Sequence, residues 1–330
     1  AALTPEFVEA EYNARAAVPE HEQYFERWKK DSAFARGTLD ARLDVAYGSE
    51  PLQRLDVSPA KDTRGTLVFL HGGYWRSLDK SDFSWLAPPF VAAGIGVVVV
   101  NYRLCPEVAI GEIVSDVLAS MRWLHVDGAR HGLDTGKVVL SGHSAGGQVT
   151  NRYGMSSKTH ETLGVPVQYV VANPSSYAWP TDERPTGRAA WPIQAGAPGF
   201  VPAMGADTAA FRSLRDGRGC TTYDQWPYGF KNRAGYVAAL SDSQLTRQLV
   251  ARPFTYLLGE DDILPLSGFD GSCAAMAQGP TRQARGQAYA KYVNERLGGH
   301  HQVVVVTGCG HNGRCIYTSE PWLRIAFPRP

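Results

Sequence analysis

The chain has 330 residues, which allows one large domain with an elaboration or two smaller ones, since a domain typically has about 100–200 residues. Hydrophobic residues make up 44% and charged residues 20%, a balance typical of a globular chain and not of a disordered one. The formal net charge of +1 leaves no basic surplus for a nucleic-acid backbone, and no apolar run is long enough to span a bilayer. We therefore set aside nucleic-acid-binding, fibrous and membrane-spanning classes.

The segments before residue 65 predict a helical arm and two strands. Residues 1–38 contain a candidate helix start, in which a threonine is followed by a proline and an acidic residue. Further on, aromatic residues recur at a spacing that would place them on one face of a helix. Residues 39–47 alternate apolar and polar side chains, and residues 52–57 form a shorter run of similar character. We predict that both are half-buried strands near a sheet edge.

From residue 65 on, continuous apolar runs alternate with helical stretches. Strands buried on both faces and separated by helices indicate βαβ units and a largely parallel sheet. With the two earlier strands, the fold class is an eight-stranded, mostly parallel α/β sheet with flanking helices, formed by a single domain over residues 1–330. The later strands are predicted at 66–70, 96–101, 137–140, 168–172, 254–258 and 302–306, and the clearest helices at 110–126 and 281–297.

Residues 174–250 interrupt this alternation. The segment is rich in glycine and proline but too aromatic for a linker. We predict a cap or lid inserted between the sixth and seventh strands and lining an apolar pocket. The alternative is an ordinary surface excursion packed by its own aromatic side chains. The aromatic residues in question are Trp179, Trp191, Phe200, Phe211, Tyr223, Trp226, Tyr228 and Phe230.

A candidate nucleophile lies directly after the fifth predicted strand, where residues 142–146 fit the pattern G-x-S-x-G around Ser144. Small residues allow a sharp strand-to-helix turn that lifts the serine hydroxyl above the sheet. The helix that follows directs its N-terminal dipole at a developing oxyanion, and the backbone amide of Ala145 can donate to that oxyanion. The alternative is a glycine-rich turn with an unremarkable serine.

A second glycine-rich loop, His71-Gly72-Gly73-Tyr74-Trp75, follows the third predicted strand. An HGGG-type loop at this place supplies the second oxyanion amide in hydrolases with the nucleophile turn. Glycine lets the backbone turn its amides toward a substrate. We predict Gly73 and Tyr74 as the donors, and a plain turn is the alternative.

The base of the site is predicted to be His311. In an open parallel sheet the reactive site lies beyond the carboxyl ends of the strands. His311 follows the last predicted strand within a glycine-rich loop, whereas His300 and His301 precede it and belong to the opposite end. His71 and His143 lie at the correct end, but each already belongs to another motif.

The acid that orients the base is predicted in the loop after the seventh strand, which carries Glu260, Asp261 and Asp262. The reach from the strand end favours Asp262, with Asp261 as the alternative. The chain order Ser144, Asp262, His311 is that of the α/β-hydrolase triad. Residues 308–313 also read G-x-G-x-x-G, but too few residues follow for a dinucleotide site, and the chemistry needs no metal or organic cofactor.

The first half of the chain, residues 1–147, resembles bacterial kynurenine formamidase-like (arylformamidase) α/β hydrolases. The resemblance rests on Tyr12 through Arg15, Leu43 through Gly48, His71 through Asp82 (HGGYWRSLDKSD), Asn101 through Leu104 and Gly142 through Gly147 (GHSAGG).

Residues 148–330 depart from that pattern and resemble a different, often secreted group of α/β hydrolases. This resemblance rests on 148–153, 171–177, 256–262 and 272–286. The G-E-x-D pattern of that group matches Gly259, Glu260 and Asp262 and so favours Asp262 as the acid. Both resemblances imply the α/β-hydrolase fold and a serine triad. The resemblance of the first half does not by itself imply the formamidase substrate, because the predicted cap lies in the half that departs.

We interpret the chain as a serine hydrolase that cleaves a carboxylic ester with an apolar or aromatic part. The alternative substrate is an N-formyl aryl amide such as N-formylkynurenine. A non-catalytic binding protein on a hydrolase scaffold is a second class, but such proteins usually lack a triad member and this chain has all three. The expected partner is a small-molecule ester or amide, and the expected assembly is a monomer or homodimer.

The five cysteines contain no C-x-x-C pair, so neither a zinc ribbon nor a thioredoxin-like site is supported. A Cys220–Cys273 bond would tie the predicted cap to the acid loop, and a Cys309–Cys315 bond would restrain the loop of the base. Cys105 would remain a free thiol. Such bonds persist in oxidising compartments, so we predict a secreted or periplasmic protein. Five reduced cysteines in a cytoplasmic enzyme are the alternative.

Overall fold

The structure is a computed structural model that describes residues 21–158, 161–162, 164–186, 210–214, 220–264 and 269–327. The helix start predicted near residue 4, and the aromatic residues Trp191 and Phe200, lie outside these described residues. The rest of the predicted arm forms helix α2 (His21–Thr38).

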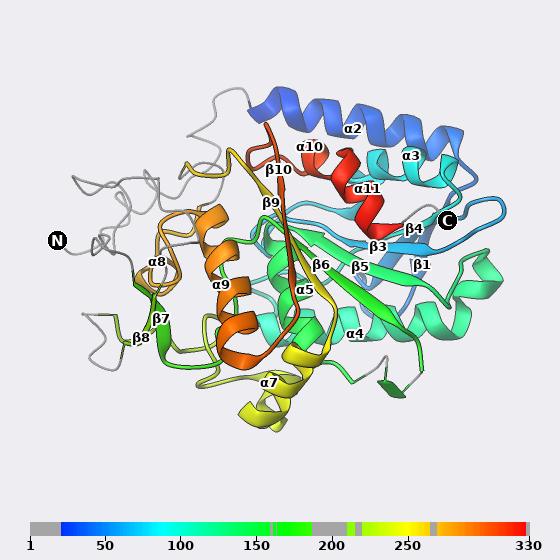
Figure 1. Cartoon of the computed structure of the whole chain (residues 1–330). Coiled ribbons are helices and arrows are strands. Elements are labelled where there is room, and N and C mark those ends of the chain that lie inside the picture. Colours follow the sequence, from blue (N-terminus) through cyan, green and yellow to red (C-terminus); the bar gives the residue numbers. More distant parts are fainter. Residues whose placement is uncertain are drawn as a thin grey trace.

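The central sheet has eight strands in the order β1-β2-β4-β3-β5-β6-β9-β10 (Figure 1). The pairs β1–β2 and β2–β4 are antiparallel and the remaining pairs are parallel. All eight predicted strands are present, so the predicted fold class is confirmed. Their bounds are β1 Arg42–Ala46, β2 Arg54–Ser58, β3 Thr66–Leu70, β4 Gly96–Val100, β5 Val138–His143, β6 Val167–Ala172, β9 Phe254–Gly259 and β10 Gln302–Val306.

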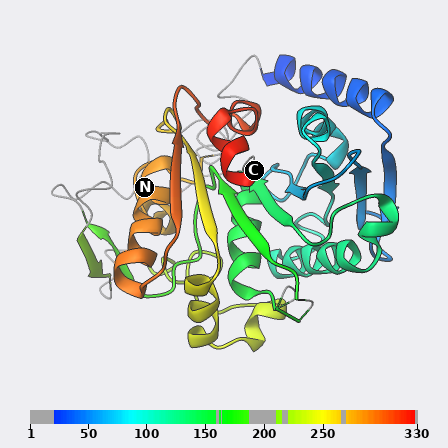
Figure 2. The same ribbon diagram turned by 45° about the vertical axis from the view of Figure 1, so that its right-hand side comes forward.

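Helices cover both faces of this sheet, as Figures 1 and 2 show. One face carries α4 (Ile110–Asp127), α5 (Ala145–Ser156), α7 (Asp242–Ala251) and α9 (Arg282–Leu297). The other face carries α2 together with α3 (Ala87–Ala92), α10 (Gly313–Tyr317) and α11 (Glu320–Ala326). Short helical turns complete the described part at Lys80–Asp82, Ser84–Leu86, Gly128–His131, Gly235–Ala239 and α8 (Cys273–Met276).

Two hydrophobic cores follow from the alternation of side chains along the strands. In β3, Val68 and Leu70 belong to the core under α4, α5, α7 and α9. The intervening Leu67 and Phe69 belong to the core under α3, α10 and α11. Every residue of β3 is buried, as expected for a strand covered on both faces.

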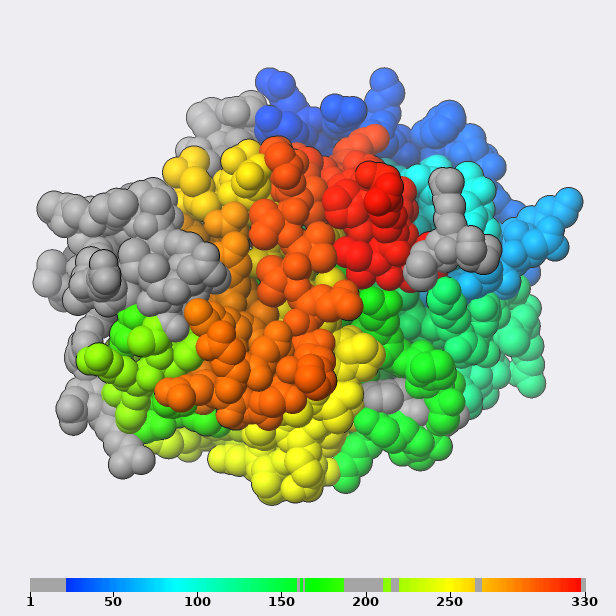
Figure 3. Space-filling view, in the orientation of Figure 1, coloured from blue at the N-terminus to red at the C-terminus, as the bar shows by residue number. Residues whose placement is uncertain are grey.

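The last strand, β10, departs from the prediction of a strand buried on both faces. Val303 is 39% exposed and Val305 is 37% exposed. The reason is position, because β10 ends the sheet order and, among the described strands, pairs with β9 alone. The segment containing β10 accordingly lies at the surface in Figure 3, where it is dark orange.

The described parts of the predicted cap pack against several helices, and the part around Trp179 packs against α9. Strands β7 (Glu183–Thr186) and β8 (Ala210–Ser213) form a separate antiparallel pair. The Trp179 ring is fully buried and lies 4.9 Å from the ring of Tyr292, and the Arg184 guanidinium stacks 5.2 Å from Trp179. Trp179 therefore packs against a helix outside the segment as well as against Arg184 within it. The role of the whole segment as a cap stays a prediction.

Both predicted disulfides are present in the structure. Cys220 and Cys273 close a separation of 53 residues and pack beside Tyr223, Ala274 and Ala277. Closing a loop of that length contributes about 4 kcal/mol to the free energy of unfolding on the chain-entropy model. Cys309 and Cys315 form the second bond, and Cys105 is a free thiol. None of the helices in the described ranges has both the length and the apolar character that crossing a bilayer requires.

Candidate active site

The three predicted triad residues follow the carboxyl ends of three parallel strands, β5, β9 and β10. Parallel strands present these ends at one edge of the sheet, so Ser144, Asp262 and His311 come from one edge. His311 Nδ1 lies 2.8 Å from Asp262 Oδ2. The His311 ring also lies 4.8 Å from the ring of His143, the residue before Ser144, so the predicted base is adjacent to the turn that carries the predicted nucleophile.

Ser144 has the strained backbone that a nucleophile turn requires. Its φ is 57° and its ψ is −116°, a conformation that costs a residue other than glycine about 1–3 kcal/mol. The Ser144 amide donates to the carbonyl of Ala172 on β6 at 3.0 Å. A Cβ at Gly146 would lie 2.1 Å from the carbonyl oxygen of Leu70, so only glycine permits α5 to approach β3 this closely.

Ala145 begins α5, and the first amides of a helix have no carbonyl partner within it. The positive end of the helix dipole lies at the same place. The backbone beside Ser144 therefore offers hydrogen-bond donors and a positive potential where an oxyanion would develop.

The glycine-rich loop after β3 lies against this turn. A Cβ at Gly72 would be 3.5 Å from Ser144 Cβ, and the Trp75 indole donates to the carbonyl of Ala145 at 3.2 Å. Gly73 has φ of +107°, and a Cβ there would lie 2.0 Å from the carbonyl oxygen of Ser77. The loop conformation therefore requires glycine at 73, and it brings Gly73 and Tyr74 beside the nucleophile turn.

His71 supports this loop from the protein interior and takes no part in the contact between His311 and Asp262. Its ring is fully buried and stacks 4.5 Å from the ring of Tyr102. The Tyr102 hydroxyl donates to the His71 carbonyl at 2.6 Å. Tyr102, which follows β4, therefore holds the backbone at the start of the loop in place.

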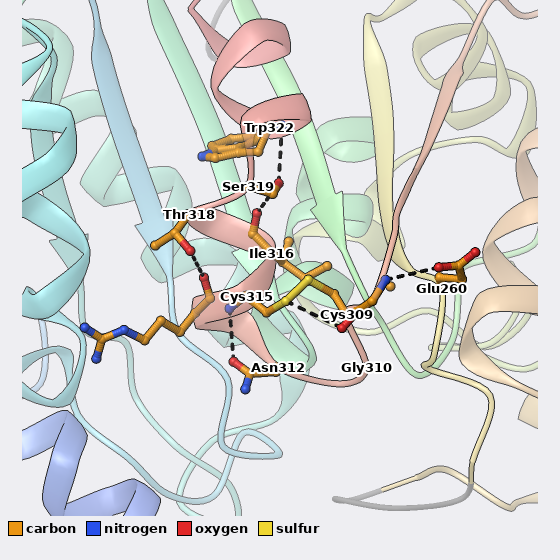
Figure 4. The surroundings of a disulfide bond; sticks show 12 residues. Glu260, Cys309, Gly310, Asn312, Cys315, Ile316, Thr318, Ser319 and Trp322 are labelled. Atoms are coloured by element: carbon orange, nitrogen blue, oxygen red, sulfur yellow. Dashed lines mark hydrogen bonds between the residues drawn. A yellow bond between two sulfur atoms is a disulfide. The ribbon is translucent and has the colours of Figure 1, made fainter.

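The loops of the acid and the base are joined to each other. The Asp261 amide donates to the Cys309 carbonyl at 2.9 Å, and the Gly308 amide donates to Glu260 Oε2 at 3.1 Å. The Cys309–Cys315 disulfide closes the loop around His311. Figure 4 shows the disulfide between Cys309 and Cys315 and, beside it, the hydrogen bond that Glu260 accepts.

Burial separates the two candidate acids. Asp262 is 2% exposed and contacts His311, whereas Asp261 is exposed to solvent. Burial raises the pKa of Asp262, but the positive charges of His311 and Arg282 outweigh it and bring the pKa to about 2. Burial and the charge of Arg282 hold the pKa of His311 below its usual value, against the opposing effect of Asp262. A neutral imidazole beside an ionised carboxylate follows near pH 7.

No grouping of three or more histidine, cysteine or acidic side chains suited to a metal ion occurs within the described part of the chain. The groups that the structure places at this site are a hydroxyl, an imidazole, a carboxylate and several backbone amides.

Comparison with known proteins agrees with this architecture. A family model described as alpha/beta hydrolase fold matches residues 67–201. The crystal structure of LpqC, a poly(3-hydroxybutyrate) depolymerase from Bordetella parapertussis, superposes with a TM-score of 0.58 at 22% identity, covering 92% of this chain and 95% of that chain. The chain has the α/β-hydrolase fold.

Two curated relatives of this α/β hydrolase carry activities in their names. Kynurenine formamidase of Salmo salar is 32% identical over 126 residues, 36% of this chain and 40% of that protein. Esterase LipU of Mycobacterium tuberculosis is 30% identical over 142 residues, 42% of this chain and 46% of that protein. Each match spans less than half of the relative's length. The predicted resemblance to kynurenine formamidases is confirmed, and that of residues 148–330 to a second group stays a prediction.

Sequence reasoning missed several polar residues around the predicted triad. Arg282 contacts Asp262 Oδ1 at 3.2 Å. Asn173 accepts the Gly259 amide at 2.8 Å and donates to the Gly310 carbonyl at 3.3 Å, so it bridges the loops of the acid and the base. A signal for Arg282 exists in the sequence. It lies seven residues before the buried Tyr289, and this spacing puts both on one helix face.

Proposed function

We propose that this chain is a serine hydrolase in which Ser144 attacks a carbonyl carbon. His311 accepts the serine proton at Nε2 and later gives it to the leaving group, while Asp262 holds the imidazole in the required tautomer. The observation that carries the proposal is the 2.8 Å contact between His311 Nδ1 and Asp262 Oδ2 beside the turn of Ser144. An ionised carboxylate only accepts hydrogen bonds, so Nδ1 carries the proton and Nε2 is free to accept another.

The oxyanion is proposed to bind to the backbone amides of Gly73, Tyr74 and Ala145. The contact of the glycine-rich loop with the nucleophile turn supports this assignment. Donors fixed before the reaction stabilise the tetrahedral intermediate without reorganisation, and one such donor is typically worth about 10²–10³ in kcat. Collapse of the intermediate gives an acyl-enzyme, which water hydrolyses with His311 acting as base again.

The proposed substrate is a carboxylic ester with an apolar or aromatic part. The match to an esterase supports this choice. The match to a kynurenine formamidase favours a second candidate, an N-formyl aryl amide.

Part of the predicted cap lies over α5, the helix that begins after Ser144. There the Arg152 guanidinium donates to the Pro227 carbonyl and stacks 5.9 Å from Trp226.

A substrate screen distinguishes these candidates. With p-nitrophenyl esters of increasing acyl length beside N-formylkynurenine, we expect the highest kcat/KM on an ester, because the matched esterase shares more of this chain than the formamidase does. The Ser144→Ala variant gives the background for each substrate. Cleavage of N-formylkynurenine alone would favour the arylformamidase, and no Ser144-dependent cleavage of either class would favour a binding protein.

We propose that the protein works in an oxidising compartment, secreted or periplasmic. The bonds Cys220–Cys273 and Cys309–Cys315 support this, since structural disulfides are rare in the cytosol. The cytoplasm is the alternative, and it requires all five cysteines to be reduced.

Thiol titration of the unreduced, denatured protein should therefore give one free thiol per chain. The thiol is that of Cys105, the one cysteine outside the two bonds. The matched variant Cys105→Ser should give none. Five thiols in the wild-type protein would contradict both disulfides and the proposed compartment together.

A further inference from the structure

A buried arginine contacts the proposed catalytic acid from the side opposite the base. Arg282 is fully buried at the start of α9. Its Nη1 donates to Asp262 Oδ1 at 3.2 Å, and its Nε donates to the Ser175 hydroxyl at 3.1 Å. The guanidinium also stacks 5.3 Å from the ring of Phe269. Three different contacts therefore fix the orientation of this side chain.

The two oxygens of Asp262 are divided between two partners. Oδ2 contacts His311 and Oδ1 contacts Arg282. A carboxylate held at both oxygens cannot rotate about its Cβ–Cγ bond without losing one contact. The orientation of Oδ2 toward the imidazole is thus determined by the arginine as well as by the histidine.

We propose that Arg282 is a positioning residue of the triad, which holds Asp262 in register with His311 and extends activity to lower pH. The inference rests on the proposed function, because it concerns the same acid and base. Arg282 is proposed to act through Asp262, whose Oδ1 its guanidinium contacts.

The effect on pH dependence follows from the sign of the buried charge. A cation beside the Asp262–His311 pair disfavours a second positive charge on the imidazole and favours the ionised carboxylate. Burial and the charge of Arg282 lower the pKa of His311, while Asp262 raises it. The neutral base therefore persists to lower pH than it would without Arg282. The other titratable or charged groups around the pair are His143 on β5, Arg285 on α9, Tyr177 after β6, Asp270 before α8, and Tyr74 in the loop after β3.

Arg285 provides a matched control one turn along the same helix. It is also fully buried and stacks 4.5 Å from the same Phe269 ring. Its hydrogen bonds go to the backbone carbonyls of Gly279, Ser175 and Asp270 and to the Met276 sulfur, and it interacts with Asp262 through its charge rather than through a hydrogen bond. Replacing either arginine disturbs a similar part of the core, but only Arg282 contacts the acid.

The test is the pH profile of kcat/KM for the best ester substrate, which reports the ionisation of the free enzyme. We expect Arg282→Met to lower kcat about 10²-fold, the cost of a small misplacement in an active site. The acidic limb of the profile should move up by about one pH unit, the effect of removing one nearby charge. Arg285→Met should lower the thermal midpoint Tm and move the acidic limb much less.

Two more conservative variants test the same role of Arg282 if Arg282→Met does not fold. Arg282→Lys retains a positive charge, so it should keep the acidic limb near its wild-type position while kcat falls. Ser175→Ala removes only the Nε acceptor and should lower kcat with little change in KM. Wild-type kcat in both variants would overturn the proposal, as would a folded Arg282→Met whose profile equals that of Arg285→Met. Neither result would affect the proposed function while Ser144→Ala remains inactive.

Discussion

Replacing Ser144 by alanine should lower kcat for ester hydrolysis by about 10⁶-fold. The hydroxyl oxygen is the atom that bonds to the acyl carbon, and no other group in the site can replace it. The backbone at Ser144 has φ of 57°, and we expect the alanine variant to keep this conformation. Serine and alanine are strained alike there, so the thermal midpoint should change little.

The double variant Ser144→Ala/His311→Ala sharpens this test. Members of a triad act as one unit, so removing a second member costs little once the first is gone. We expect the double variant to be no slower than Ser144→Ala alone. Losses that multiply would show that His311 acts independently of Ser144 and would contradict the triad.

Asp262→Asn should lower kcat about 10⁴-fold through the wrong imidazole tautomer. Arg282 donates to Oδ1 of the present aspartate, so it should bind the amide oxygen of the new asparagine. The amide nitrogen would then face His311 Nδ1 and donate to it, which moves the proton to Nε2 and blocks acceptance from Ser144. Kinetics below the thermal midpoint of the variant measure this effect, because the buried Arg282 loses its ionic partner and stability falls.

Asp261→Asn is the control for that experiment. Its side chain is exposed, and its backbone amide keeps the hydrogen bond to the Cys309 carbonyl. The substitution should change kcat only a few-fold, as expected for a surface carboxylate that does not touch the base. The reverse ranking of the two variants would move the acid by one residue along the chain.

The sheet could be predicted from the sequence because a parallel strand covered on both faces is apolar at every position. Thr66–Leu70 is such a strand, with all five residues buried. The turn at Ser144 could be predicted because the approach of α5 to β3 requires Gly146. In both cases a local steric or burial requirement leaves a direct mark in the residue types.

Features that depend on contacts between distant segments could not be predicted in the same way. Asp261 and Asp262 are adjacent residues of the same type, and the direction of the turn after β9 decides which side chain is buried. The apolar character of Trp179 indicates burial but not its partner, Tyr292 on α9. The helix spacing of Arg282 indicates that it is buried, but its contact with Asp262 depends on the approach of the two segments in three dimensions.

The most direct measurement for the proposed mechanism is labelling with an organophosphonate, followed by mass spectrometry of the peptides. An activated serine forms a stable covalent adduct with such a reagent, whereas an ordinary serine reacts negligibly because no base removes its proton. We expect one adduct per folded chain, on the peptide containing Ser144, and none on Ser144→Ala or on the denatured wild-type protein. An adduct on another residue, persistent labelling of Ser144→Ala, or no adduct on the folded wild-type protein would contradict the account.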